Sequence, residues 1–325
     1  MIKEMSIWRN LFRDNNVRTL NQAMASGRVR YVVNLAETLH DHRYAEIANE
    51  IAARPSVRLV LIAGPSSSGK TTSSKRLALH MRVNGLNPII ISMDDYFRNR
   101  VDTPRDANGE YDFECLEALD VPFLNEQLEQ LLEGREVEIP KYDFTSGTRN
   151  FVGQFLKLTD NDVLIMEGIH GLNPGLTPQI PREEKFGLYV SVLTPLYINA
   201  QTRIPSSDYR LLRRMVRDNQ FRGMTAEDTI LRWPSVRAGE AKNILPFKQY
   251  ADAEFNSVLQ YEIPMLKCYA EPLLQFIPES SPAVGEARRL LDLIRSVIAM
   301  TPGDMRHIPP TSIVREFIGG SSFHD

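Results

Sequence analysis

A complete Walker A sequence, Gly64-Pro65-Ser66-Ser67-Ser68-Gly69-Lys70-Thr71, constrains the fold of this chain more than any other feature. Gly64 and Gly69 let the backbone close around phosphate oxygens, where a Cβ atom would block the approach. Lys70 supplies a point charge for the β- and γ-phosphates, and the Thr71 hydroxyl can ligate Mg²⁺. The motif predicts a loop that binds the phosphates of a nucleotide.

The residues on both sides place this loop in a strand–loop–helix unit. Residues 57–63 form an apolar run suited to a buried parallel strand. Residues 71–84 have the length of a helix, and Gly85 can cap its C-terminus. The aligned N–H groups at such a helix start bind anions. The predicted ATP contacts in this unit are therefore Gly64, Pro65, Ser66, Ser67, Ser68, Gly69, Lys70, Thr71 and Thr72.

The composition is that of a soluble globular protein. The chain has 325 residues, 42% of them hydrophobic, and a net charge of −3, which gives no general attraction to nucleic acid or anionic membrane. Cys115 and Cys268 are too few for a disulfide framework and lack metal-ligand spacing. No apolar run reaches membrane-spanning length, and the first residues do not resemble a signal peptide. We expect a cytoplasmic protein with no membrane or nucleic-acid partner, and homo-oligomerisation is left open.

Further apolar runs predict more strands of the same sheet. Buried strands are expected at 88–93, 163–166 and 188–193, with a helix at 121–132 and a hairpin at about 137–158. Strands that alternate with helices indicate a parallel sheet with right-handed crossovers. Ligands gather at the carboxyl ends of such strands, where the Walker A loop, Asp94 and Glu167 all fall.

These two carboxylates are the candidates for chemistry at the sheet edge. Asp94 would lie beyond the γ-phosphate, where a general base can deprotonate an attacking hydroxyl. Glu167 can hold Mg²⁺ directly or through water, together with Thr71. Acids at strand ends also cap helices, so capping is the alternative role for both. The sequence leaves open whether Asp94 is the base and Asp95 the cap, or the reverse.

A run of arginines follows Asp208. Arg210, Arg213, Arg214 and Arg217 share one helical face. Arginine guanidinium groups suit the charge that spreads over a transferring phosphoryl group, so we predict a lid that closes over ATP, with Arg213 and Arg217 among the ATP contacts. A solvated surface or a nucleic-acid face is the alternative.

Together these elements predict an α/β fold of the P-loop NTPase type. It is a three-layer αβα sandwich with a parallel sheet, a substrate-side β-hairpin and a helical arginine lid at about 205–245. We expect a kinase domain over 55–300, preceded by a helical appendage at 1–54 and followed by an extended tail at 301–325. The appendage has apolar residues at helical intervals over 34–54, and the tail is rich in Pro, Gly and Ser.

Several motifs occur in a characteristic order. They are the Walker A loop followed by residues 91–98, 111–114, 139–144, 166–169 and 210–214. Over residues 57–275 this series resembles the uridine/cytidine kinase branch of the phosphoribulokinase–uridine kinase family. It is most similar to a bacterial variant whose kinase domain follows a threonyl-tRNA-synthetase-like region, of which residues 19–53 would be the end.

The resemblance implies phosphorylation of a nucleoside 5′-hydroxyl that depends on ATP and Mg²⁺, with Asp94 as base. It also implies a nucleoside pocket lined by Phe97, Phe113 and Tyr142, with Arg210 contacting the substrate. Aromatic faces can stack on a base, although from the residues alone these side chains fit a core position equally well.

Two positions depart from the family pattern. Glu114 stands where an Asp usually grips the ribose hydroxyls, and its neighbour Asp112 could take that role. Gly147 stands where a His usually contacts the base, and losing that hydrogen bond weakens the expectation of pyrimidine specificity.

Three functions follow as hypotheses. The first is a nucleoside kinase with Lys70 and Asp94 as catalytic residues. The second is a sugar-phosphate kinase of the phosphoribulokinase type, with Arg149 and Arg210 binding the second dianion. The third is a nucleotide-binding regulator with vestigial kinase activity, which the changes at 114 and 147 suggest.

Overall fold

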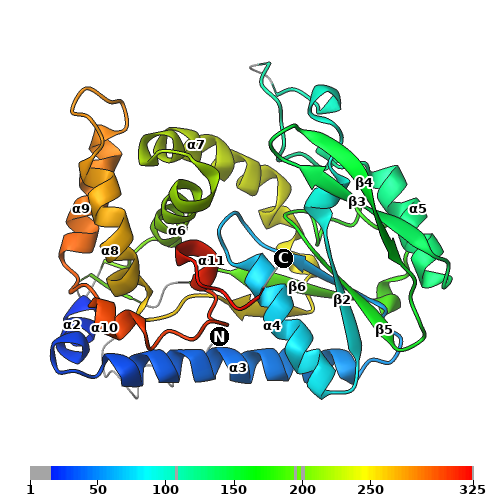
Figure 1. Cartoon of the computed structure of the whole chain (residues 1–325), viewed down its shortest axis with the longest axis horizontal. Coiled ribbons are helices and arrows are strands. Elements are labelled where there is room, and N and C mark those ends of the chain that lie inside the picture. The colour runs from blue at the N-terminus through cyan, green and yellow to red at the C-terminus, as the bar shows by residue number, and fades with distance from the viewer. Residues whose placement is uncertain (1–15, 107–108, 194–195, 199–201, 324–325) are drawn as a thin grey trace.

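A parallel five-stranded sheet forms the centre of the molecule (Figure 1). The computed structural model describes residues 16–106, 109–193, 196–198 and 202–323. The strand order is β2-β5-β1-β6-β7, and each pair of neighbours is parallel. The strands are β1 (Leu59–Ala63), β2 (Asn87–Ser92), β5 (Asp162–Glu167), β6 (Lys185–Ser191) and β7 (Ala253–Asn256). The predicted parallel α/β sheet is therefore confirmed.

The two faces of the sheet are covered by different layers. Alternate residues of β1 point to opposite sides: Val60 and Ile62 join one hydrophobic core, and Leu59 and Leu61 join the other. On the first side lie α3 (Val29–Ala52) and α4 (Lys70–Val83). On the second lie α5 (Val121–Leu132) and a hairpin of β3 (Val137–Asp143) and β4 (Thr148–Leu156). Every residue of β1 and β5 is buried, as expected for strands covered on both faces.

The arginine segment forms a helix that packs beside the sheet. This helix, α6 (Ser206–Arg222), ends at Gly223, whose φ of +63° is left-handed. The next helix, α7 (Ala226–Asn243), begins with a capping box between Thr225 and Asp228. Two further helices, α8 (Glu262–Gln275) and α9 (Val284–Arg295), pack against each other, and α6 contacts both α7 and α8. The lid predicted at 205–245 therefore falls on the α6–α7 pair.

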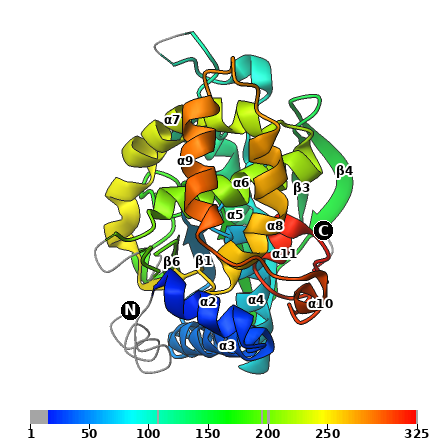
Figure 2. The same ribbon diagram turned by 90° about the vertical axis from the view of Figure 1, so that its left-hand side faces the viewer.

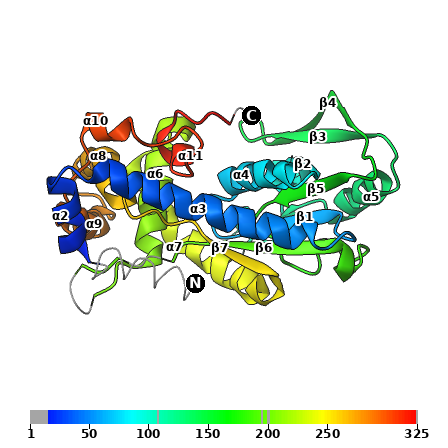
Figure 3. The ribbon, with the colours of Figure 1, turned by 90° about the horizontal axis from the view of Figure 1, so that it is seen from below.

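The N-terminal helices are part of the main core and not a separate appendage. After α2 (Val17–Ala25), α3 runs along the length of the molecule beside α4 (Figure 3). Tyr44, Ile47 and Ile51 of α3 are fully buried in the core that contains β1. The Tyr44 hydroxyl donates to Ser73 Oγ of α4 at 3.0 Å. The helical periodicity predicted this helix, but it did not show which surface the apolar side covers.

The last segment also differs from the expectation of an extended tail. It folds back with two short helices, α10 (Pro302–Met305) and α11 (Arg315–Ile318), and α11 contacts α6 (Figure 2). Ile308, Ile313, Val314 and Phe317 are buried in the main core. These apolar residues are spaced among Pro, Gly and Ser, so the composition of the segment hid their packing role. Within the described ranges, no helix combines the length and apolar character needed to cross a bilayer.

Candidate active site

The Walker A loop connects β1 to α4 and is held in a strained conformation. Gly69 caps α4 with φ +88°, and Ser67 has φ +58°, which is rare for a residue with a side chain. A Cβ atom on Gly64 would lie 2.4 Å from the carbonyl oxygen of Val190 on β6. Gly64 is therefore required by packing against the neighbouring strand, and Gly69 by its backbone angle.

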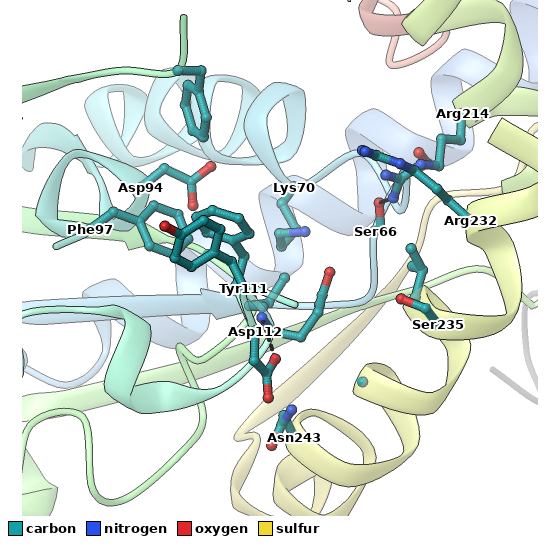
Figure 4. A pocket seen from close by; sticks show the side chains of 18 of the residues that line it. Ser66, Lys70, Asp94, Phe97, Tyr111, Asp112, Arg214, Arg232, Ser235 and Asn243 are labelled. Atoms are coloured by element: carbon teal, nitrogen blue, oxygen red, sulfur yellow. Dashed lines mark hydrogen bonds between the residues drawn. The ribbon is translucent and has the colours of Figure 1, made fainter. Parts of the chain in front are cut away.

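A cavity of about 1020 Å³ opens above the carboxyl ends of the strands. In Figure 4, Lys70 points into it between Asp94 and Phe97 on one side and Ser66 and Arg214 on the other. Of the predicted ATP contacts, those that line this cavity are Ser66, Ser67, Gly69, Lys70, Thr71 and Arg217. Gly64, Pro65, Ser68, Thr72 and Arg213 do not.

Sheet register brings the two predicted carboxylates to the same edge. Glu167, the last residue of β5, pairs with Ile62 of β1 and Ser92 of β2. Asp94 follows two residues after Ser92, in a 3₁₀ turn at Met93–Tyr96. Both carboxylates line the cavity with Lys70, so the sequence prediction of a shared edge matches the geometry.

The neighbouring acids Asp94 and Asp95 have different surroundings. Asp95 is buried and accepts hydrogen bonds from the Tyr142 backbone N–H at 3.1 Å and from Lys141 Nζ at 3.4 Å. It anchors the β3–β4 hairpin to the sheet. Asp94 instead faces the cavity, where the protein around it displaces bulk water and raises the pKa of its carboxyl, against the opposing charge of Lys70. Of the two acids, Asp94 has the position of a base.

Thr71 and Glu167 provide two oxygen donors for a divalent cation. The Thr71 hydroxyl donates to Glu167 Oε1 at 3.0 Å. Burial raises the pKa of Glu167 to about 7, although the charge of Lys70 opposes the shift. Within the described ranges, no group of three or more His, Cys, Asp or Glu residues comes together as a metal site. The pair therefore fits Mg²⁺ that takes its remaining ligands from water and phosphate.

The arginines of α6 fall into two groups. Arg214, Arg217 and Arg222 line the cavity, and all three form ion pairs with the single buried carboxylate of Asp218. Arg214 also donates to Ser66 Oγ in the loop at 2.8 Å. Three positive charges therefore share a single negative charge, and the group keeps a net positive charge.

The predicted ATP contact Arg213 lies behind the loop instead. It is fully buried, forms an ion pair with buried Glu262, and donates to the carbonyl oxygens of Ser67 and Ser68 at 3.2 and 3.3 Å. The predicted substrate contact Arg210 is likewise occupied: it donates to Ser66 O at 2.9 Å and pairs with Glu240 at 2.6 Å. Both arginines support the loop from the side that faces the protein interior. The sequence shows only that the arginines share a helical face, so it could not tell these supporting residues from residues that contact a ligand.

Aromatic side chains gather opposite the arginines. Phe97 lies 6.2 Å from Phe113 and 5.6 Å from Tyr142 between ring centroids, so the predicted set forms one wall of the cavity. Tyr111 and Phe144 extend this wall and were not predicted. Each of them lies two positions from a predicted residue, Tyr111 from Phe113 and Phe144 from Tyr142, and this spacing could have indicated them.

Acidic groups accompany this wall. Glu114 and Asp112 both line the cavity, and Asp112 Oδ1 accepts from the Glu114 backbone N–H at 3.0 Å. Burial raises the pKa of Glu114, and the charge of Arg214 opposes this. The space that a Cβ atom on Gly147 would occupy is filled by the side chain of Arg100, which also lines the cavity. Neither Arg100 nor Glu316, a third carboxylate near Lys70, was predicted from the sequence.

Comparison with known proteins identifies one matching family and several relatives. The model of the family described as "Phosphoribulokinase / Uridine kinase family" matches residues 59–264. A uridine kinase from Deinococcus deserti is 31% identical over 192 residues, which cover 59% of this chain and 83% of that protein. A uridine kinase from Lactobacillus helveticus is 30% identical over 199 residues, which cover 60% and 83%. A solved structure described as a possible uridine kinase from Bacillus stearothermophilus aligns with a TM-score of 0.40 and 23% identity, over 62% of this chain and 89% of that one.

Proposed function

This chain belongs to the phosphoribulokinase/uridine kinase family and is a kinase, and we propose that it transfers the γ-phosphate of ATP to the 5′-hydroxyl of a nucleoside. One observation carries the proposal. The Walker A lysine, a cavity-facing carboxylate at position 94 and a wall of aromatic rings line the same cavity of about 1020 Å³. Such a space has the size of sites that hold small-molecule ligands.

Each group has a role that its position supports. The N–H groups of the loop and Lys70 hold the phosphate chain, and Asp94 accepts the proton of the attacking hydroxyl. Thr71 and Glu167 hold Mg²⁺, which when bound neutralises charge on the phosphates. Arg214, Arg217 and Arg222 carry more positive charge than Asp218 neutralises, so they stabilise the negative charge of the transferring group. Arg217 is one of the two ATP contacts predicted on this helix, and Arg214 and Arg222 join it in place of Arg213.

The surroundings of the predicted dianion site favour a nucleoside over a sugar phosphate. Arg149 pairs with Asp120 at 2.9 Å and lies over the Phe123 ring, and Arg210 pairs with Glu240. Neither lines the cavity, so they do not form a phosphate site there. The aromatic wall and its acids suit a neutral acceptor with a flat base and several hydroxyl groups.

A panel assay tests the proposal. Formation of ADP would be measured with each common nucleoside, starting with uridine and cytidine, and with several sugar phosphates. We expect ADP release that depends on a nucleoside in the wild type and is lost in Lys70→Ala. Activity with sugar phosphates alone would show that the acceptor is a sugar phosphate and not a nucleoside. ATP binding with no acceptor-dependent ADP release across the panel would favour the regulator.

The role of position 94 can be tested separately. Asp94→Asn keeps the size of the side chain but removes the base, so we expect turnover to fall by about 10²- to 10⁴-fold. ATP affinity measured by calorimetry should stay within about twofold, because the loop and Lys70 are unchanged. Asp102→Asn, at an exposed position outside the cavity, is the matched control. Near-normal turnover in Asp94→Asn would remove this residue from the mechanism.

A further inference from the structure

The C-terminal segment places a carboxylate on the first turn of the helix that follows the phosphate loop. Glu316 Oε2 accepts a hydrogen bond from the Thr72 backbone N–H at 3.1 Å and another from Thr72 Oγ1 at 2.9 Å. Thr72 is the third residue of α4, so its N–H has no acceptor within the helix. A negative charge at this point is favoured by the helix dipole. Glu316 therefore satisfies a donor pair at the anion-binding end of α4.

The backbone around Glu316 is fixed by packing. Ile313 covers the loop so closely that a Cβ atom on Gly69 would lie 2.4 Å from Ile313 Cδ1. The Phe317 ring lies 5.0 Å from the guanidinium of Arg213, which itself braces the loop. Both Ile313 and Phe317 are fully buried. The carboxylate is thus held at Thr72 by a docked segment and not by an exposed, freely moving tail.

A phosphate chain would need the same place. Glu316 lines the cavity with Lys70 and Thr71, and it fills the space in front of Thr72, which does not itself line the cavity. Backbone N–H groups at this helix start are the donors that a phosphate loop offers. Two anions cannot share one donor pair without strong repulsion. We propose that Glu316 is an internal competitor for the nucleotide: its carboxylate occupies the Thr72 donors in the free protein and must leave when the phosphates bind. This inference rests on the proposed nucleotide-binding function.

Only the side chain has to move. Release of the whole segment would expose Ile313, Val314 and Phe317, which are buried in the main core. Rotation of the Glu316 side chain breaks two hydrogen bonds and leaves that core intact. The cavity offers other partners, because Arg217 and Arg222 share the single carboxylate of Asp218 with Arg214.

Calorimetric titration of the full chain tests the competition. Wild type, Glu316→Gln and Glu316→Ala would each be titrated with ADP and with inorganic tripolyphosphate. Removing a charged acceptor from the donor pair should strengthen binding of both ligands by about tenfold in Glu316→Ala, with Glu316→Gln between it and the wild type. Glu129→Gln, an exposed position on α5 with the same change of charge, should stay within about twofold.

A second condition separates contact from long-range charge. In 0.5 M NaCl the effect of a distant charge is screened, whereas competition for one donor pair persists. Equal or weaker ADP binding by both Glu316 variants would overturn the proposal, as would a gain that disappears in high salt. In either case ADP binding by the wild type and its acceptor-dependent turnover would leave the kinase function standing. Failure of every variant to bind either ligand would overturn both.

Discussion

Asp94 and Asp95 show how two adjacent identical residues come to differ in chemistry. The 3₁₀ turn after β2 directs Asp95 toward the backbone of the β3–β4 hairpin and leaves Asp94 in the cavity. The Asp95 carboxylate is therefore occupied by a structural hydrogen bond, whereas the Asp94 carboxylate is open to a ligand in the cavity. Desolvation inside the cavity raises the pKa of Asp94, which suits the base that we propose at this position.

Gly147 can be tested against a glycine of the same hairpin. Gly147 has φ +72° and Gly153 has φ +78°, but only at Gly147 would a Cβ atom clash, with Arg100. We expect Gly153→Ala to lower the free energy of unfolding by about 1 kcal/mol through backbone strain. Gly147→Ala should cost about 2 kcal/mol, since Arg100 must also move. Urea unfolding measures both, and equal losses would show that Arg100 shifts freely.

Because His170 is buried, we expect the free energy of unfolding to depend on pH. Its side chain is 2% exposed, and burial lowers its pKa to about 4, below the ordinary value of 6.5. The unfolded chain therefore binds the proton more readily, and the stabilising contribution of the neutral ring, present above pH 6.5, is lost as pH falls toward 4. We expect a loss of about 2 kcal/mol between pH 7 and pH 5 from this residue.

The measurement compares variants across that range. Urea unfolding at pH 7 and pH 5 should show a smaller pH-dependent loss in His170→Gln than in the wild type. His307→Gln, at an exposed position, should keep the wild-type difference. An unchanged pH dependence in His170→Gln would assign the loss to other groups.

At the scale of elements, α6 carries two functions on neighbouring residues. Arg213→Met would leave Glu262 buried without its partner and should lower the free energy of unfolding by about 3–5 kcal/mol. Arg214→Met makes the same change one residue later, where Asp218 keeps Arg217 and Arg222 as partners. It should cost about 1 kcal/mol or less and mainly weaken nucleotide binding.

Urea unfolding and calorimetric ADP titration, run on the same samples, separate these effects. A large stability loss in Arg214→Met together with a mild one in Arg213→Met would contradict the assignment of bracing and ligand-facing arginines. Loss of ADP affinity without loss of stability in Arg213→Met would do the same.

The elements that the sequence predicted well are those whose signal is local. The strands at β1, β2, β5 and β6 are short apolar runs, and their carboxyl ends had to meet once the sheet was parallel. The orientation of α6 could not be predicted from nearby residues. Its arginines share one helical face, and only packing against the rest of the protein decides which of them are buried. The contact of Glu316 could not be predicted, since 244 residues separate it from Thr72.

At the scale of the whole molecule, α3 joins the kinase core through buried charge. Glu37 accepts from Arg76 Nη1 of α4 at 3.0 Å and from the Tyr261 hydroxyl at 2.5 Å, and it is 5% exposed. If this helix left, the buried guanidinium of Arg76 and the buried hydroxyl of Tyr261 would both lose Glu37 as a partner. We infer that the N-terminal helices and the sheet unfold together.

Glu37→Gln tests this cooperativity. Arg76 keeps its pair with Asp41 at 2.6 Å, so loss of the buried pair with Glu37 should lower the free energy of unfolding by about 1–3 kcal/mol. Fluorescence of tryptophan and far-ultraviolet circular dichroism should still report one coincident transition. Glu46→Gln, exposed on the same helix, should change stability by less than about 1 kcal/mol. Separate transitions in the two signals would show that α3 unfolds independently.

The covering of the phosphate loop by the last part of the chain has a consequence for biosynthesis. A ribosome adding roughly 5–20 residues per second needs about 12–50 s to pass from Thr72 to Glu316, the 244 residues between them. Throughout that interval the nascent chain holds a loop whose apolar cover does not yet exist. A frameshift shortly before the codon of Ile313 would spare the whole motif and the sheet, yet its product would lack Ile313 and Glu316 and would never close over its own anion site.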